Sequence, residues 1–131
     1  MKPDNLLRIA VLPLARPTFD VPFAEETCRD AWNLLEKLPA EWIGTRDLLF
    51  NADAVEAKLK ELVLNPPDLL LVMQLTFTDA TMTVKLAETL DAPLLFWSFP
   101  EARTGGRLRL NSLCGINLAS HALGKSGIRY D

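Results

Sequence analysis

The chain has 131 residues, of which 49% are hydrophobic and 24% are charged, and its formal net charge at pH 7 is −3. This size and balance are typical of one globular domain with its own core, and a mildly acidic chain without a basic cluster is not expected to bind nucleic acid. The apolar runs are too short to cross a membrane and the first residues lack a signal-peptide pattern, so we expect a single cytoplasmic domain over residues 1–131.

The first half of the chain alternates between strand patterns and helix patterns. Residues 6–14 are rich in branched aliphatic side chains and predict a buried strand, which a proline-containing loop follows. Apolar side chains recur at helical spacing over residues 23–38 and predict an amphipathic helix that ends before a proline. Residues 42–43 indicate a short edge strand, and Asp53 is the expected N-cap of a helix over residues 54–64.

The second half continues this alternation. Residues 69–73 form a continuously apolar run, which is typical of a strand covered on both faces. Thr78 or Asp79 is expected to cap the helix that follows. The remaining elements are expected as a helix over residues 80–90, a strand over 92–99, a helix over 112–123 that a glycine-containing segment ends, and the start of a fifth strand at 128–130.

Strands that alternate with helices and have continuous apolar patterns imply a parallel sheet between helix layers. We therefore predict a three-layer αβα fold of the α/β class, flavodoxin-like (Rossmann-like), with strand order 2-1-3-4-5, because the second strand is weak enough to be an edge. The chain stops as the fifth strand begins. We expect the sheet to be incomplete at its carboxyl end, as a piece of a longer protein or a domain completed by a partner.

Ligands of open parallel sheets bind at the carboxyl ends of the strands. Three polar segments follow expected strands, at residues 16–20, 74–79 and 98–115. We expect them to converge on one edge of the sheet. Their carboxylates are candidates for binding sugar hydroxyls or a metal, although Asp79 serves equally well as a helix cap.

The third segment has the most unusual chemistry. The run from Thr104 to Arg107 places two glycines beside a guanidinium, and Asn111 and Ser112 stand at a helix start, where free N–H groups favour an anion or a polarised hydroxyl. An ordinary glycine loop with a helix cap explains the same residues, and loop chemistry alone favours that interpretation. Cys114 lies in the first helical turn, where a thiolate is stabilised, but a small packing residue is the preferred interpretation.

A complete active site cannot be assembled from these residues. The single histidine, His121, lies in the middle of an expected helix and is interpreted as a surface or packing residue. No set of carboxylates and histidine with metal-binding character is present, and no serine or cysteine has a paired base. Cys28 and Cys114 have no metal spacing and are expected to be free thiols.

Residues 9–20, 71–80 and 104–115 together resemble the amino-terminal region of the L-fucose isomerase and L-arabinose isomerase family, most closely its fucose-isomerase-like branch. The resemblance covers most of the chain in order, and the third segment is the most specific. The arabinose isomerases have the motif asparagine, glutamine, serine, alanine, histidine, glycine there. Ser112 and Gly115 match this motif, whereas Cys114 stands in place of the histidine.

This resemblance implies an intramolecular oxidoreductase that interconverts an aldose and a ketose with a divalent metal, typically Mn²⁺. The family's metal ligands lie in later domains, so neither a catalytic residue nor a metal ligand is expected in this chain. The amino-terminal domain of the family is flavodoxin-like and borders the active site of a neighbouring subunit. The resemblance therefore implies that the polar end of the substrate is lined by Gln74, Thr78, Arg107, Asn111, Ser112 and Cys114.

The leading hypothesis is the substrate-side and oligomerisation domain of a sugar isomerase that is inactive alone. Its expected partners are a small sugar, the remaining domains or a partner chain, and further copies of itself in a homo-oligomer. Two alternatives remain open at this point: a free-standing module that binds a small sugar or an anion, and an assembly subunit that a partner chain completes.

Overall fold

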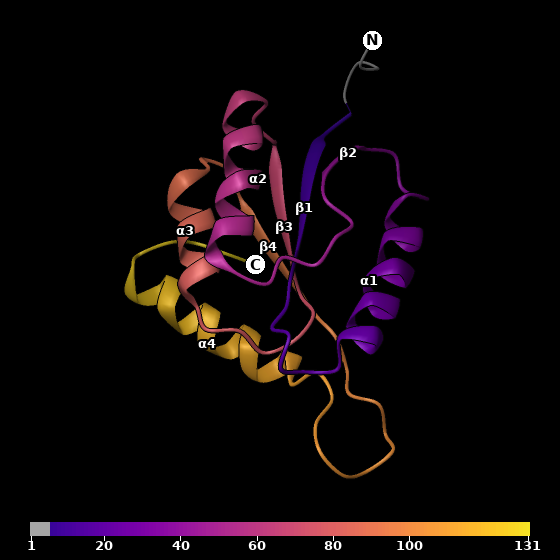
Figure 1. Cartoon of the computed structure of the whole chain (residues 1–131). Helices are drawn as coiled ribbons and strands as arrows, with labels where there is room; N and C mark the ends of the chain where they lie inside the picture. The colour runs from indigo at the N-terminus through magenta and orange to yellow at the C-terminus, as the bar shows by residue number, and fades with distance from the viewer. Residues whose placement is uncertain (1–5) are drawn as a thin grey trace.

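A computed structural model describes residues 6–131, which fold into a parallel sheet with helices on both faces (Figure 1). The residues that argue against a signal peptide precede residue 6 and lie outside the described range. The elements are β1 (Arg8–Leu14), α1 (Val21–Leu35), β2 (Glu41–Gly44), α2 (Ala52–Leu64), β3 (Leu69–Gln74), α3 (Thr81–Thr89), β4 (Leu94–Ser98) and α4 (Ser112–Lys125).

The order of the four strands is β2-β1-β3-β4, and every neighbouring pair is parallel. This confirms the predicted α/β class, the parallel sheet, the strand order as far as the fourth strand, and the position of β2 at an edge. In the pairing register Leu14 lies opposite Gln74, and Gln74 lies opposite Ser98. Because these strands end level with one another, the loops after β1, β3 and β4 leave the sheet at the same edge.

The sheet separates two apolar layers, because successive residues of a strand point to opposite faces. Leu12 and Val72 pack in the cluster formed with α2, α3 and α4, whereas Val11 and Met73 pack in the cluster formed with α1. Figure 1 shows α1 on one side of the sheet and α2, α3 and α4 on the other. Burying each such aliphatic side chain contributes about 1.5–3 kcal/mol, so the two clusters hold the sheet between its helices.

Gly44 ends β2 and allows the chain to pass close to β1. Its φ is +105°, and a Cβ at this position would lie 2.2 Å from the backbone oxygen of Val11, so any larger residue would be strained. The segment after Gly44 then follows β1, because Leu49 N–H donates to Pro13 O and Leu49 O accepts from Ala15 N–H at 2.8 and 3.1 Å. This path brings the start of α2 to the same sheet edge as the loop after β1.

Several helix boundaries differ from the predicted ones by one to three residues, and the structure explains two of these differences. The first helix ends at Leu35 instead of residue 38, because the N–H groups of Lys37 and Leu38 each bond a carbonyl three residues back in tighter turns. The second helix is capped by Asn51 and not by Asp53. The side chain of Asn51 accepts from Ala54 N–H at 2.9 Å, and its extended backbone suits an N-cap, whereas Asp53 lies in the first turn.

The predicted secondary structure of the last residues also differs from the observed one. Helix α4 continues through Gly124 to Lys125, and residues 128–130 are not a strand. Ile128 N–H still bonds the α4 carbonyl of Leu123, so the segment after it only leads from the helix to the sheet. Asp131 is the residue that reaches β4: its N–H donates to Leu94 O and its carbonyl accepts from Phe96 N–H.

Both thiols are free, as predicted. Cys28 is buried in the α1 cluster, and this burial raises the pKa of its thiol to about 11. Across residues 6–131, no helix has the length and apolar character needed to span a membrane.

Candidate functional site

The three polar segments that follow β1, β3 and β4 meet at one edge of the sheet, which confirms the predicted convergence. Arg16 N–H donates to Thr76 Oγ1 at 2.8 Å and joins the first two segments. Phe77 N–H donates to Leu110 O at 2.8 Å and joins the second to the third. Three hollows lie among these loops, and the side chains that line them are the groups at this edge that a ligand could contact.

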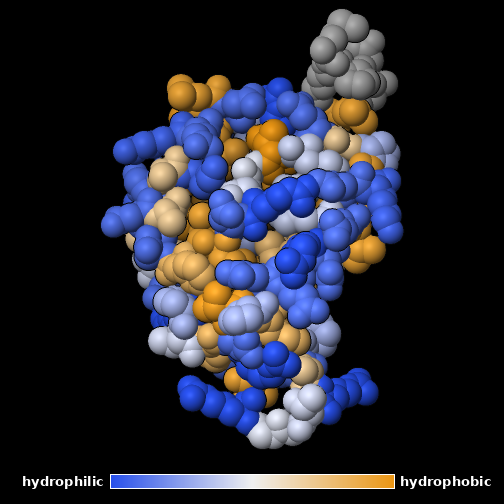
Figure 2. Space-filling model, turned by 45° about the vertical axis from the view of Figure 1, so that its right-hand side comes forward, coloured by the Kyte–Doolittle hydropathy of each residue, from blue (hydrophilic) through white to orange (hydrophobic). Residues whose placement is uncertain are grey.

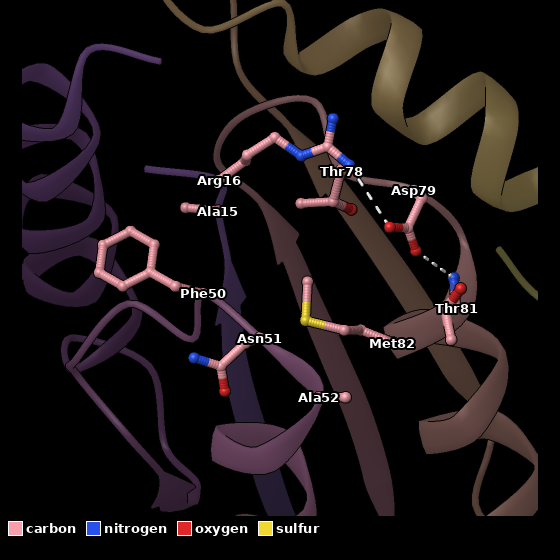
Figure 3. Close-up of a pocket in the computed structure, with 9 residues that line it drawn as sticks. All are labelled: Ala15, Arg16, Phe50, Asn51, Ala52, Thr78, Asp79, Thr81 and Met82. Atoms are coloured by element: carbon pink, nitrogen blue, oxygen red, sulfur yellow. Dashed lines mark hydrogen bonds and ion pairs between the residues drawn. The ribbon is translucent and has the colours of Figure 1, made fainter. Parts of the chain in front are cut away.

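The first hollow lies between the ends of β1 and β3, where the strand order reverses. Its volume is about 300 Å³, and it is lined by residues 15–16, 50–52, 78–79 and 81–82. In Figure 3 the side chains of Arg16 and Asp79 point toward each other on one side of this hollow, and Phe50 and Asn51 lie on the other. The hollow therefore combines the β1 end, the start of α2 and the start of α3.

Arg16 and Asp79 neutralise each other in this first hollow. Arg16 Nη2 lies 3.4 Å from Asp79 Oδ2, and the guanidinium also lies over the Phe77 ring. Asp79 Oδ1 accepts from Thr81 N–H at 2.9 Å, so Asp79 does support the start of α3 although Ala80 holds the N-cap position. Hydrogen bonds from Thr81 and then the charge of Arg16 lower the pKa of Asp79, so this carboxylate is a structural anion.

Gln74 and Thr78 form a buried pair beside the first hollow. Gln74 is fully buried, and its Nε2 donates to Thr76 O at 2.8 Å and to Thr78 Oγ1 at 2.9 Å. Gly115 of α4 packs directly on it, because a Cβ there would lie 3.0 Å from Gln74 Nε2. Gln74 therefore holds Thr78 in place, and Thr78 is the member of the pair that lines the hollow.

The second hollow, of about 270 Å³, lies between the start of α4 and the loop before it, and Asn111, Ser112 and Cys114 line it. The Ser112 hydroxyl is committed to the backbone: it accepts from Phe99 N–H at 2.9 Å and donates to Gln74 O. Asn111 is left-handed with φ of 54° and makes no side-chain cap bond. Cys114 is exposed, so its interpretation as a buried packing residue is wrong.

The third hollow, of about 220 Å³, lies between the loop after β1 and the β4–α4 loop (residues 99–111), and residues 18–20 and 107–109 line it. Of the six predicted site residues, Arg107 lines this hollow and the other five do not. The structure thus brings Asn111, Ser112 and Cys114 together, places Thr78 and Gln74 at the neighbouring hollow, and separates Arg107 from both groups. Their roles in binding remain predictions.

Glu101 closes the base of the β4–α4 loop. Its carboxylate accepts from three successive N–H groups, those of Arg109 at 2.6 Å, Leu110 at 3.1 Å and Asn111 at 2.7 Å. Partial burial raises the pKa of Glu101, but these backbone bonds outweigh it and lower the pKa overall. The sequence showed Glu101 only as a carboxylate after a strand, because nothing local marks the amides eight to ten residues later as its partners.

Arg109 ties the same loop to the start of α1. Its Nε donates to Asp20 Oδ2 at 2.8 Å, and its guanidinium carbon lies 4.1 Å from the centre of the Phe23 ring. The other oxygen of Asp20 caps α1 by accepting from Phe23 N–H at 3.1 Å. Bonding to Arg109, and then to Phe23 N–H, lowers the pKa of Asp20, so this carboxylate is also engaged in structure.

The part of the chain that the structure describes contains no group of side chains arranged as metal ligands. Over residues 6–131, no group of three or more histidine, cysteine, aspartate or glutamate side chains is placed to hold an ion. The three carboxylates at the sheet edge are engaged as described above. These residues do not fit the Mn²⁺ that the resemblance implies, and no step of a reaction is assigned to a metal held by them.

Comparison with known proteins gives a consistent result. Residues 10–131 match the family described as the fucose/sulfoquinovose isomerase amino-terminal domain. A sulfoquinovose isomerase from Alkalicoccus urumqiensis is 34% identical over 125 residues, which cover 95% of this chain and 28% of that protein. A second, from Priestia aryabhattai, is 31% identical over 115 residues, covering 88% of this chain and 26% of that protein.

A third relative, the sulfoquinovose isomerase from Clostridium sp. (strain MSTE9), is 29% identical over 117 residues and is covered to 26% of its length. The chain therefore spans about a quarter of the length of these relatives. The matched segment includes β1 from residue 10 onward, the whole of β2, β3 and β4, and the three loops at the sheet edge. On this match, the chain belongs to the fucose/sulfoquinovose isomerase family, and its residues 10–131 correspond to the amino-terminal domain of that family.

Proposed function

We propose that this chain is the substrate-side domain of a metal-dependent aldose–ketose isomerase that acts on a sugar of the fucose or sulfoquinovose type. In this proposal the domain is inactive alone, and the metal and the proton-transfer groups come from the remaining domains. The working enzyme is a cytoplasmic homo-oligomer, in which the sheet edge of this domain borders the active site of a neighbouring subunit.

The observation that carries the proposal is that the carboxylates at the sheet edge are engaged in holding the fold, whereas other polar side chains line the hollows. Asp20, Asp79 and Glu101 are each committed to backbone N–H groups, and the first two also to arginines. A hydroxyl, an amide, a thiol and a guanidinium line the hollows beside them. Such groups bind and orient sugar hydroxyls, whereas a proton transfer needs a free acid or base of suitable pKa.

The predicted site residues then have two kinds of role. Thr78, Asn111 and Cys114 line the hollows and are proposed to contact the sugar. Gln74 and Ser112 are positioning residues, because the Gln74 Nε2 group and the Ser112 hydroxyl bond within the domain and hold the loops that carry the others.

A chimera tests this proposal. Residues 10–131 replace the matching segment of the Alkalicoccus urumqiensis sulfoquinovose isomerase, and turnover of sulfoquinovose and L-fucose is measured with Mn²⁺. We expect turnover by the chimera and none by the 131-residue chain alone. Turnover by the chain alone would contradict its proposed inactivity. A folded chimera without turnover, beside an active parent enzyme, would contradict the substrate-side role.

A further inference from the structure

We propose that the hollow between the β1–α1 and β4–α4 loops binds the anionic group of the substrate, a sulfonate, through the guanidinium of Arg107. The inference rests on the proposed function and adds to it the place where the charge of the substrate is bound and the residue that binds it. It is drawn from the distribution of charge among the three hollows.

Only one of the three hollows at this edge carries an excess of positive charge. In the first, Arg16 and Asp79 are the charged lining residues and they pair with each other. In the second, Glu101 is the one charged residue among the described residues that line it, and a negative carboxylate disfavours an anion. The third is lined by two arginines and one aspartate, which leaves one cation in excess.

That excess cation is Arg107. The guanidinium of Arg109 is committed to Asp20 at 2.8 Å and to the face of Phe23, so these two lining charges cancel. Arg107 is exposed and makes no hydrogen bond or ion pair with any residue from 6 to 131. Thr18 lines the same hollow and offers a hydroxyl. An arginine fork beside a hydroxyl matches the several oxygens of a tetrahedral anion.

The loop presents this arginine in a form suited to a ligand. Its base is held by the three backbone bonds to Glu101, whereas Gly105 and Gly106 have φ of 73° and 78°, and a Cβ built on either glycine would meet nothing within 4 Å. Figure 2 shows strongly hydrophilic side chains at the lower end of the molecule, where Figure 1 places the β4–α4 loop. Arg107 is therefore anchored on its carboxyl side and free to adjust on the other.

The relatives named as sulfoquinovose isomerases supply the matching ligand class. Sulfoquinovose is a hexose with a sulfonate on carbon 6, and a sulfonate stays ionised at all physiological pH values. A guanidinium is likewise always charged. The predicted contact is therefore independent of pH between 5 and 9 and is weakened by salt.

The test uses the 131-residue chain, its ¹⁵N-labelled amides and four titrants: methanesulfonate, sulfoquinovose, glucose 6-phosphate and glucose. We expect methanesulfonate and sulfoquinovose to shift the amides of Thr18 and residues 107–109, with sulfoquinovose binding more tightly. Arg107→Ala should weaken both by about tenfold, the usual effect of losing one charge-assisted contact. Arg103→Ala is the matched control, because Arg103 is an exposed arginine of the same loop that lines none of the three hollows.

The outcomes separate the anion subsite from the proposed function. Equal affinity in wild type and Arg107→Ala, an equal loss in Arg103→Ala, or no shift at tens of millimolar titrant would each overturn the subsite, whatever the chimera does. Tighter binding of glucose 6-phosphate than of sulfoquinovose would overturn its assignment to a sulfonate. Glucose shifting the same amides as strongly as sulfoquinovose would overturn its anionic character. A chimera without turnover would leave these binding results intact.

Discussion

The hydroxyl of Ser112 joins three elements of the sheet edge at one atom. It accepts from Phe99 N–H after β4 and donates to the carbonyl of Gln74 at the end of β3, while its own backbone begins α4. All these groups are buried, so removing the hydroxyl leaves a backbone donor and a backbone acceptor unpaired. Each unpaired group costs about 1–3 kcal/mol.

We therefore expect Ser112→Ala to lower the free energy of unfolding by roughly 2–3 kcal/mol in urea denaturation. Ser120→Ala on the same helix is the control, because its hydroxyl bonds no other residue in 6–131; it should change stability by less than about 0.5 kcal/mol. A loss below about 1 kcal/mol for Ser112→Ala would show that water replaces both bonds.

A second single residue, Glu101, contributes to stability through the charge of its carboxylate. Its folded pKa lies below the ordinary value of 4.5 because three N–H groups bind the ionised form more strongly than partial burial opposes it. A lowered carboxylate pKa contributes stability above the unfolded pKa, and this contribution disappears as pH falls through the folded pKa.

The stability of the wild type should thus exceed that of Glu101→Gln at neutral pH, and the difference should shrink as pH falls below 4.5. Thermal unfolding from pH 7 to pH 3 measures it. Glu88→Gln, at an exposed position of α3 where the side chain bonds no residue between 6 and 131, should follow the wild type at every pH. A difference between wild type and Glu101→Gln that stays constant with pH would contradict the role of the ionised form.

At the scale of elements, the packing of α4 against the β3–α3 loop decides the geometry of the site. Gly115 allows this approach, since a Cβ there would lie 3.1 Å from Phe77 Cα and equally close to the Gln74 side chain. Gly124, farther along the same helix, faces open space. The two glycines thus make a matched pair in one helix.

Replacing each by alanine gains about 1 kcal/mol of helix propensity, but overpacking at the first position costs about 1–3 kcal/mol. We expect Gly124→Ala to stabilise the domain by up to about 1 kcal/mol and Gly115→Ala to destabilise it by a similar amount. Urea unfolding of both variants measures the opposite signs. A stabilised Gly115→Ala would mean that the loop after β3 yields without cost.

The elements also show what a sequence can predict. The strands and most helical residues were predicted because hydrophobic periodicity is local. The sequence predicts Asp53 as the N-cap of α2, whereas the structure shows Asn51 in that position, because the extended backbone of Asn51 suits a cap. The hydrogen bond from the Ser112 hydroxyl to the Gln74 carbonyl could not be predicted, because Gln74 lies 38 residues earlier in the chain.

At the scale of the whole molecule, the strand order and the convergence of three loops followed from general rules of parallel sheets. The division of that edge into three hollows could not be predicted from these rules, since it depends on which charges pair across loops. Arg16 with Asp79 and Arg109 with Asp20 are separated by 63 and 89 residues. Arg107 lacks such a partner among residues 6–131, and no local pattern reveals this difference.

The closed base of the β4–α4 loop has a consequence for how such proteins diversify. Because Glu101 and residues 109–111 bond one another whatever lies between them, the intervening tip is insulated from the fold. We therefore expect mutations in the tip to change the length and charge of the loop without unfolding the sheet. Under the function proposed above, we expect the tip to be the place where sequence changes alter sugar preference and where segments can be exchanged between relatives.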